Sequence, residues 1–150
     1  MANWQWFGRL HRAAYRATGG RIGGRLVGLD MLLLTTTGRK SGAPRTTPMP
    51  FFLDGDRFVI VGSNGGSDRD PLWWKNLLAD PRAAIEIGRE RHAVLARLAT
   101  TEERARLWPL LREWNPNYRR YERRTRREIP VVLLAVTAST SAASPSPAPH

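Results

Sequence analysis

Six runs of β-branched and apolar residues constrain the fold of this chain more than any other feature of its sequence. Most are joined by short turns, and a small sheet with helices inserted between its strands is best closed into a barrel. Pro48 and Pro50 in the second run favour an edge or bulged strand, because proline has no N–H to donate to a neighbour. The sequence therefore predicts an α+β fold, a barrel of about six mostly antiparallel strands with peripheral helices. The runs span residues 31–38, 45–54, 57–63, 83–88, 92–100 and 129–136.

Helices are expected wherever the apolar residues recur with helical spacing and capping residues mark a start. Asp70 followed by Pro71 is typical of an N-cap and a first helical position. Thr100 and Glu103 fit a capping box. The predicted helices span residues 3–18, 72–80, 103–114 and 118–125.

Composition divides the chain into three parts. Residues 1–30 hold the first amphipathic helix and a glycine-rich linker, and residues 31–136 hold the predicted barrel. Residues 137–150 are rich in proline, alanine and serine. Such a segment buries too little apolar surface to offset the entropy of ordering, so we expect a disordered tail.

Charge and residue usage narrow the classes of function. The 24 Lys and Arg against 13 Asp and Glu give a net charge of +11, which attracts anions such as nucleic acid, acidic lipid or an anionic cofactor. The absence of cysteine excludes disulfides, cysteine-ligated zinc and thiol chemistry, and agrees with a cytoplasmic location. No apolar run reaches the about 20 residues that cross a bilayer, and the N-terminus lacks the apolar core of a secretory signal.

The search for a metal or a nucleophile points to an organic cofactor. Three histidines, at positions 11, 92 and 150, are too dispersed in the sequence for a metal site. Ser41 and Ser63 have no evident histidine partner, so a hydrolytic triad is not expected. Any chemistry would then be carried by a bound organic cofactor.

A basic turn with the sequence GRKSGAPR separates the first two strand-like runs. Its glycines allow close backbone approach, and Arg39, Lys40, Ser41 and Arg45 supply donors and charge, which is the chemistry of an anion site. A solvated hairpin loop explains the same residues equally well.

Two further segments contain candidate site residues. Gly65 and Gly66 precede a predicted helix, where free N–H groups and the helix dipole favour the binding of an anion. Trp73 and Trp74 are adjacent in that helix, so their side chains cannot both face the core. Tyr118 and Tyr121, three residues apart, share a helical face. They are interpreted either as pocket lining and proton donors or as surface anchors, and the arginines between 112 and 127 as a solvated face.

The long ordered pattern LLLTTTGRKSGAPRTTPMPFFLDGDRFVIVGSNGGSDRDPLWWKNLLADP resembles the deazaflavin-dependent nitroreductase family, which uses coenzyme F420. The resemblance continues through TTEERARLWPLLREWNPNYRRYERRTRREIPVVLLAV and covers roughly residues 30–136. It implies a split β-barrel, related to the oxidase barrels that bind flavin mononucleotide. The implied reaction is hydride transfer from the reduced coenzyme to a quinone or, adventitiously, a nitroaromatic compound.

The resemblance also implies roles for particular residues. Arg39, Lys40, Ser41 and Arg45 would bind the phosphate and glutamate tail of the coenzyme, and Tyr118, Tyr121 and Ser63 would face the acceptor. Pro50 and Asn115 depart from the residues expected there. The N-terminal helix would cover the site or touch the membrane. The residues implied to surround the deazaflavin ring and its ribityl chain are Thr46, Thr47, Pro48, Met49, Pro50, Val61, Gly62, Ser63, Asn64, Leu72, Trp73, Trp74, Lys75 and Asn76.

Two alternatives remain at this point. A non-enzymatic basic module for nucleic acid or acidic lipid would explain the charge, although no nucleic-acid-binding motif is present. A barrel that binds flavin mononucleotide would explain the predicted fold. The sequence leaves the oligomeric state open.

Overall fold

The computed structural model describes residues 25–26 and 29–141. The predicted helix over residues 3–18 and most of the C-terminal tail lie outside them. The elements are β1 (Arg25–Leu26), β2 (Leu29–Thr37), β3 (Pro44–Pro50), β4 (Phe52–Asp54), β5 (Arg57–Val61), the short 3-10 helix η1 (Asn64–Gly66), α2 (Leu72–Ala79), β6 (Arg82–Ile87), β7 (Glu90–Leu98), α3 (Thr101–Trp114), α4 (Asn117–Arg124) and β8 (Val131–Ser141).

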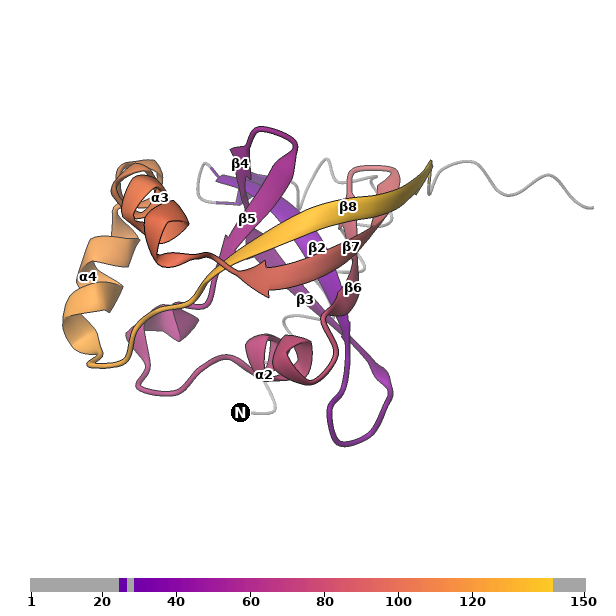
Figure 1. Cartoon of the computed structure of the whole chain (residues 1–150), viewed down its shortest axis with the longest axis horizontal. Helices are drawn as coiled ribbons and strands as arrows, with labels where there is room; N and C mark the ends of the chain where they lie inside the picture. The colour runs from indigo at the N-terminus through magenta and orange to yellow at the C-terminus, as the bar shows by residue number, and fades with distance from the viewer. Residues whose placement is uncertain (1–24, 27–28, 142–150) are drawn as a thin grey trace, which may run out of the picture.

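The strands form one curled antiparallel sheet in the order β1-β2-β6-β7-β8-β5-β4, with β3 also paired to β2 (Figure 1). β3 and β4 are consecutive stretches of one extended segment, interrupted at Phe51. One end of this segment pairs with β2 and the other with β5, so the segment joins the two ends of the sheet. The predicted barrel of about six strands is therefore confirmed, with the second predicted run divided in two and β1 added.

β3 occupies the edge that its prolines require. Among the described strands it pairs with β2 alone, from Thr37 opposite Pro44 to Met31 opposite Pro50. The proline nitrogens donate no hydrogen bond, so a second partner strand would have lacked donors at those positions. The hydroxyls of Thr35 and Thr46 lie 2.8 Å apart across the pair.

Two apolar cores lie on opposite faces of the sheet. The first fills the barrel, includes Leu32, Ile60 and Ile85, and is closed by Trp74 and Leu77 of α2. The second lies outside the barrel, between the β5–β8 surface and helices α3 and α4. Residues 131–134 alternate between the two cores, and all four are at most 1% exposed. This double burial explains why the start of β8 reads as an uninterrupted apolar run.

Two boundaries differ from those expected. β8 continues to Ser141, beyond the limit expected at residue 136, because its backbone pairs with β7 as far as Glu90 while residues 135–140 remain exposed. Asp70 was expected to be an N-cap, but Pro71 occupies that position, and the Asp70 carboxylate accepts a hydrogen bond from Arg127 instead. The capping box of Thr100 and Glu103 is confirmed.

An ion-pair network fastens α3 to the β4–β5 hairpin. Asp54 accepts hydrogen bonds from Arg57 and Arg106, and Glu103 accepts from Arg57 and Arg97. The bonds from Arg106 and then Arg57 lower the pKa of Asp54 to about 2, against a partial opposing effect of burial, and the pKa of Glu103 is also lowered.

Replacing Asp54 should therefore change how stability depends on pH. A depressed folded-state pKa contributes stability above the ordinary value of 3.8 and loses it as the pH falls to about 2. We expect Asp54→Asn to be less stable than the wild type at neutral pH, with the difference shrinking across that range. Urea unfolding measured at several pH values checks this. Asp56→Asn, at an exposed carboxylate of the same hairpin, is the control; an equal effect there would refute the role of the network.

Candidate functional site

The basic turn is a tight loop between β2 and β3. The Gly38 N–H donates to the Ala43 carbonyl and the Gly42 N–H to the Gly38 carbonyl, both at 2.8 Å. A Cβ atom at Gly38 would lie 2.7 Å from the Ser41 Oγ, and Gly42 has a φ of +71°, so both positions favour glycine. This compact backbone presents Arg39, Lys40 and Arg45 to solvent.

These three cations have no carboxylate partner among the described residues. The Arg45 guanidinium lies 3.4 Å from the Ser41 Oγ, and that same oxygen accepts a hydrogen bond from the Ala43 N–H. Arginines elsewhere, such as Arg57 and Arg106, are engaged by acidic side chains. A cluster of unneutralised charge on an ordered turn fits a phosphodiester or several carboxylates.

A buried amide fixes the basic turn against α2. The Asn76 Oδ1 accepts a hydrogen bond from the Arg39 N–H at 3.1 Å, and its Nδ2 donates to the Thr36 Oγ1 at 3.1 Å. Asn76 is only 7% exposed, so both polar ends are used within the protein. The Asn76 side chain therefore positions the basic turn against α2, and its expected contact with the cofactor stays a prediction.

We expect Asn76→Leu to weaken coenzyme binding by loosening the basic turn. The substitution keeps the branched shape of the side chain but leaves the Arg39 N–H and the Thr36 hydroxyl without their partner, which costs about 1–3 kcal/mol of unfolding free energy. The loosened turn should bind the coenzyme several-fold more weakly. Fluorescence titration and urea unfolding measure the two effects, with the exposed Asn117→Leu as control. Unchanged affinity in Asn76→Leu would show that the turn is ordered without this amide.

A second candidate region, the loop of residues 62–70, precedes α2. A Cβ atom at Gly62 would lie 2.6 Å from the Pro130 Cγ, and one at Gly66 would lie 3.1 Å from the Tyr121 Cα. Gly66 also has a φ of +85°. The glycines thus allow the loop to pack against both α4 and the start of β8, which brings Ser63 and Tyr121 into the same region.

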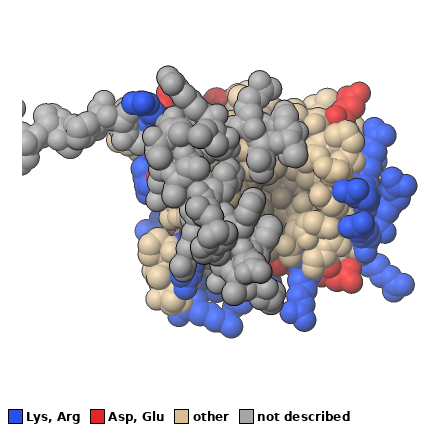
Figure 2. Space-filling view, turned by 180° about the vertical axis from the view of Figure 1, so that it is seen from behind, with Lys and Arg blue, Asp and Glu red and all other residues tan. Residues whose placement is uncertain are grey.

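Arg127 holds this loop and was not singled out in the sequence. Its side chain is 15% exposed and donates hydrogen bonds to the loop backbone and to Asp70. The other arginines of α4 and its C-terminal end, at positions 119, 120, 123, 124 and 126, are exposed as expected for a solvated face. Figure 2 shows lysine and arginine side chains projecting from the edge of the molecule where Figure 1 places α4. No sequence signal separates Arg127 from these neighbours.

The two tyrosines differ sharply in environment. Tyr118 is 3% exposed and packs between Trp108 and Trp114, each with a ring centroid 6.1 Å away. Burial raises the pKa of Tyr118 well above its ordinary value, although a hydrogen bond with Asn115 lowers it in part. Tyr121 is half-buried, and the Arg120 guanidinium lies 5.5 Å from its ring centre. Tyr118 is a core residue, whereas Tyr121 is partly accessible; the expected roles of both tyrosines toward an acceptor stay predictions.

The remaining expected ring-binding residues are only partly accessible. Met49, Trp74 and Ser63 are buried, with exposed fractions of 8%, 7% and 9%. Trp73 is half-buried against the barrel core, so the two tryptophans do differ in exposure, while Leu72 is 69% exposed. The basic turn, α2 and the loop before it lie along one side of the molecule (Figure 1), with α4 next to that loop.

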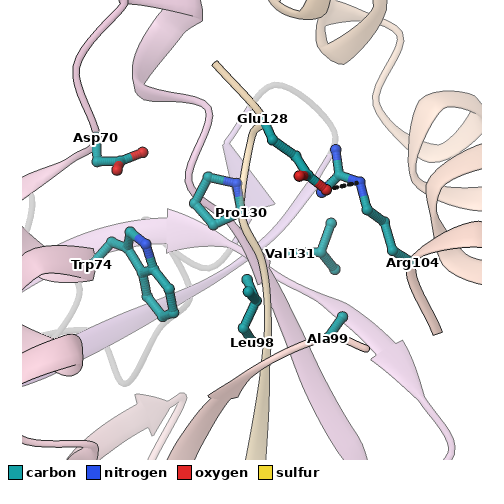
Figure 3. A pocket seen from close by; sticks show the side chains of 8 residues that line it. All are labelled: Asp70, Trp74, Leu98, Ala99, Arg104, Glu128, Pro130 and Val131. Carbon is teal, nitrogen blue, oxygen red and sulfur yellow. Dashed lines mark ion pairs between the residues drawn. The ribbon is translucent and has the colours of Figure 1, made fainter. Parts of the chain in front are cut away.

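Two hollows adjoin these elements. One, of about 140 Å³, lies between Trp74 and the start of β8, and the ion pair of Arg104 with Glu128 stands at its side (Figure 3). The other, of about 360 Å³, is an open depression beside the basic turn, between Thr35–Thr37, Gly42 and Asp80. Each hollow has a carboxylate in its lining, Asp70 in the first and Asp80 in the second, and each of these is paired with an arginine. Only the second hollow adjoins the basic turn, so its position suits an anionic tail better.

The described residues contain no helix long and apolar enough to cross a membrane. Within the same ranges, no group of three or more histidine or acidic side chains is placed to hold a metal ion.

Comparison with known proteins identifies close relatives. The family described as F420H(2)-dependent quinone reductase matches residues 6–136. An F420H(2)-dependent quinone reductase of Mycobacterium tuberculosis is 47% identical over 130 residues, covering 84% of this chain and 87% of that protein. A solved F420-H2 dependent reductase has a TM-score of 0.64 and 34% identity, covering 70% of this chain and 93% of its own. A putative pyridoxamine 5'-phosphate oxidase from Listeria innocua, at 15% identity and a TM-score of 0.55, shares the fold; the alignment covers 76% of this chain and 89% of the oxidase.

Proposed function

The chain belongs to the F420H(2)-dependent quinone reductase family, and on that basis we propose that it is an oxidoreductase that uses reduced coenzyme F420 to reduce a quinone. Among the structural observations, the strongest support is the cluster of three cations on the basic turn, which have no carboxylate partner among the residues that the structure describes. A non-enzymatic basic module would not require this turn to be fastened to α2 by a buried amide. Both family membership and the split-barrel fold confirm expectations from the sequence.

In the proposed binding mode, the anionic groups of the coenzyme lie at the basic turn. Arg39, Lys40 and Arg45 bind the phosphate and carboxylates of the coenzyme, because charge-assisted hydrogen bonds to these groups are the strong ones. The coenzyme, when bound, supplies two electrons as hydride. The ring of the coenzyme is oriented by residues of β3, of the loop before η1 and of α2. Binding energy gained at the tail is used to position the reacting atoms.

Hydride addition to a quinone leaves negative charge on a carbonyl oxygen. A hydrogen-bond donor aimed at that oxygen stabilises the charge in the transition state. The half-buried Tyr121 hydroxyl and the Ser63 hydroxyl are the proposed donors, and Tyr118 is the less accessible of the two tyrosines for this role. Reduction of nitroaromatic compounds would require the same groups and remains a proposal. A cytoplasmic location, with membrane contact through the N-terminal helix, is also proposed.

A titration tests the proposed function directly. Coenzyme F420 is added to the apoprotein while its fluorescence is followed, and reduced coenzyme is then mixed with protein and menadione. We expect micromolar binding and protein-dependent oxidation of the coenzyme. Absence of binding at micromolar protein would exclude the proposal. Purification with a tightly bound yellow flavin would favour the flavin mononucleotide alternative.

A further inference from the structure

We propose that Arg127 is a positioning residue for hydride transfer, because its guanidinium holds the loop of residues 62–67 in the conformation that presents N–H donors to the reaction site. This inference rests on the proposed function. It concerns a side chain that lies outside the basic turn and outside the set of residues expected to touch the coenzyme.

The guanidinium binds the loop at both ends. At the N-terminal end of the loop, one terminal nitrogen of the guanidinium donates two hydrogen bonds, to the Gly62 carbonyl at 3.1 Å and to the Ser63 carbonyl at 2.9 Å. At the other end, the Nε donates to the Ser67 carbonyl at 2.9 Å, and the second terminal nitrogen donates to the Asp70 Oδ1 at 2.9 Å. With only 15% of the side chain exposed, these bonds are largely shielded from water.

A shorter connection supports the same clamp. The Thr125 hydroxyl donates to the Asp68 Oδ1 at 3.0 Å and accepts a hydrogen bond from the Arg127 N–H at 3.3 Å. The segment that follows α4 is therefore joined to residues 62–70 through two side chains, those of Thr125 and Arg127, and the Arg127 N–H helps to orient Thr125.

The loop backbone changes handedness where the guanidinium binds it. Ser63 is right-handed, with φ −69° and ψ −30°, whereas Asn64 and Gly65 have φ values of +46° and +64°. A right-handed residue followed by a left-handed one turns successive N–H groups toward the same side, which forms a concave donor site for anions. Asn64 is the one described non-glycine residue with positive φ, so this conformation has to be held by its surroundings.

The hydrogen bonds within the loop leave these donors available. The N–H groups of Gly62, Gly66 and Ser67 bind backbone carbonyls. Those of Ser63, Asn64 and Gly65 have no partner among the described residues. Since Arg127 occupies the carbonyls of Gly62 and Ser63, the free N–H groups are the loop's remaining capacity to stabilise a negatively charged oxygen.

The geometry requires the planar, forked shape of arginine. Four hydrogen bonds to four acceptors use three nitrogens at fixed angles, whereas a lysine ammonium is a compact point charge on a flexible stem. Arg127→Lys keeps the charge and most of the packing but cannot hold both ends of the loop. If Arg127 only neutralised Asp70, lysine would maintain kcat. If Arg127 positions the loop, lysine would not maintain kcat.

The experiment compares Arg127→Lys, Arg127→Ala and the exposed control Arg126→Ala with the wild type. Coenzyme affinity is measured by fluorescence titration. The kcat and KM for menadione are measured with saturating reduced coenzyme, and thermal unfolding measures stability. We expect kcat to fall roughly ten- to a hundredfold in both Arg127 variants, because small misplacements of reacting groups cost that much. Coenzyme affinity should change less, since the basic turn is intact. Millimolar guanidinium should restore part of kcat in Arg127→Ala alone.

The outcomes separate this inference from the function on which it rests. An active wild type with unchanged kcat in folded Arg127→Lys, or lower stability without a kinetic effect, would overturn the positioning role and leave the proposed function intact. If Arg127→Ala does not fold, the kcat of Arg127→Lys decides. A wild type that binds no coenzyme would remove both proposals.

Discussion

An Arg39→Glu, Lys40→Glu double variant is expected to bind coenzyme F420 at least about 100-fold more weakly than the wild type while remaining folded. Each charge-assisted hydrogen bond lost is worth about 1.5–3 kcal/mol, and about 1.4 kcal/mol corresponds to tenfold in affinity. The reversed charges also repel the phosphate and carboxylates of the tail. Because both side chains are exposed and have no partner among the described residues, folding should hardly change.

Fluorescence titration at two salt concentrations and thermal unfolding measure these effects. Wild-type affinity should fall as salt rises, and the variant should lose most of that dependence, because fewer opposite charges remain to be screened. The double variant Arg89→Glu, Arg126→Glu reverses two exposed charges outside the basic turn and is the control matched in net charge. Equal weakening in this control would show that overall net charge, and not the basic turn, attracts the coenzyme.

Truncation of Tyr118 is expected to have the largest effect on stability. Tyr118 is almost fully buried between Trp108 and Trp114 in the core beneath α3 and α4. Removing a buried aromatic ring costs about 3–5 kcal/mol, because the apolar contacts are lost and the cavity only partly collapses. Tyr118→Ala should therefore unfold at a much lower urea concentration, since a domain has only about 5–15 kcal/mol of net stability.

Replacement of the hydroxyl alone separates packing from catalysis. Tyr118→Phe keeps the ring and loses the hydrogen bond with Asn115, at a cost of about 1 kcal/mol. Its kcat for menadione should remain close to that of the wild type. Tyr121→Phe should lower kcat and leave stability almost unchanged, because its ring is only half-buried. The reverse pattern would restore Tyr118 as the donor and require the helix to move during turnover.

The order of the strands along the chain could be predicted from local signals. Each strand repeats β-branched or apolar residues between turn residues, and the Thr100–Glu103 capping box acts within one helical turn. The basic turn was likewise identified from a short stretch, and its exposure follows from three cations placed on a tight hairpin. These features depend on neighbours in sequence, which explains why the sequence was sufficient.

Other boundaries required the partner strand or side chain. The tail continues β8 to Ser141 because β7 offers backbone donors and acceptors there, which composition does not record. Asp70 turns away from its expected capping position because Arg127, 57 residues later, provides a charged partner. The expected roles of the site residues remain proposals; the structure adds that Asn76 and Tyr118 are buried and hydrogen-bonded within the protein.

The sequence by itself determined the family, the number of main strands and the position of the cationic turn, since these are properties of contiguous residues. Only the tertiary structure distinguished Arg127 from its exposed neighbours and Tyr118 from Tyr121. In the sequence, Arg127 and its neighbours are the same residue type, and so are Tyr118 and Tyr121. What separates them is the set of groups from distant elements that surrounds each side chain, and that set determines its burial, charge and hydrogen bonding.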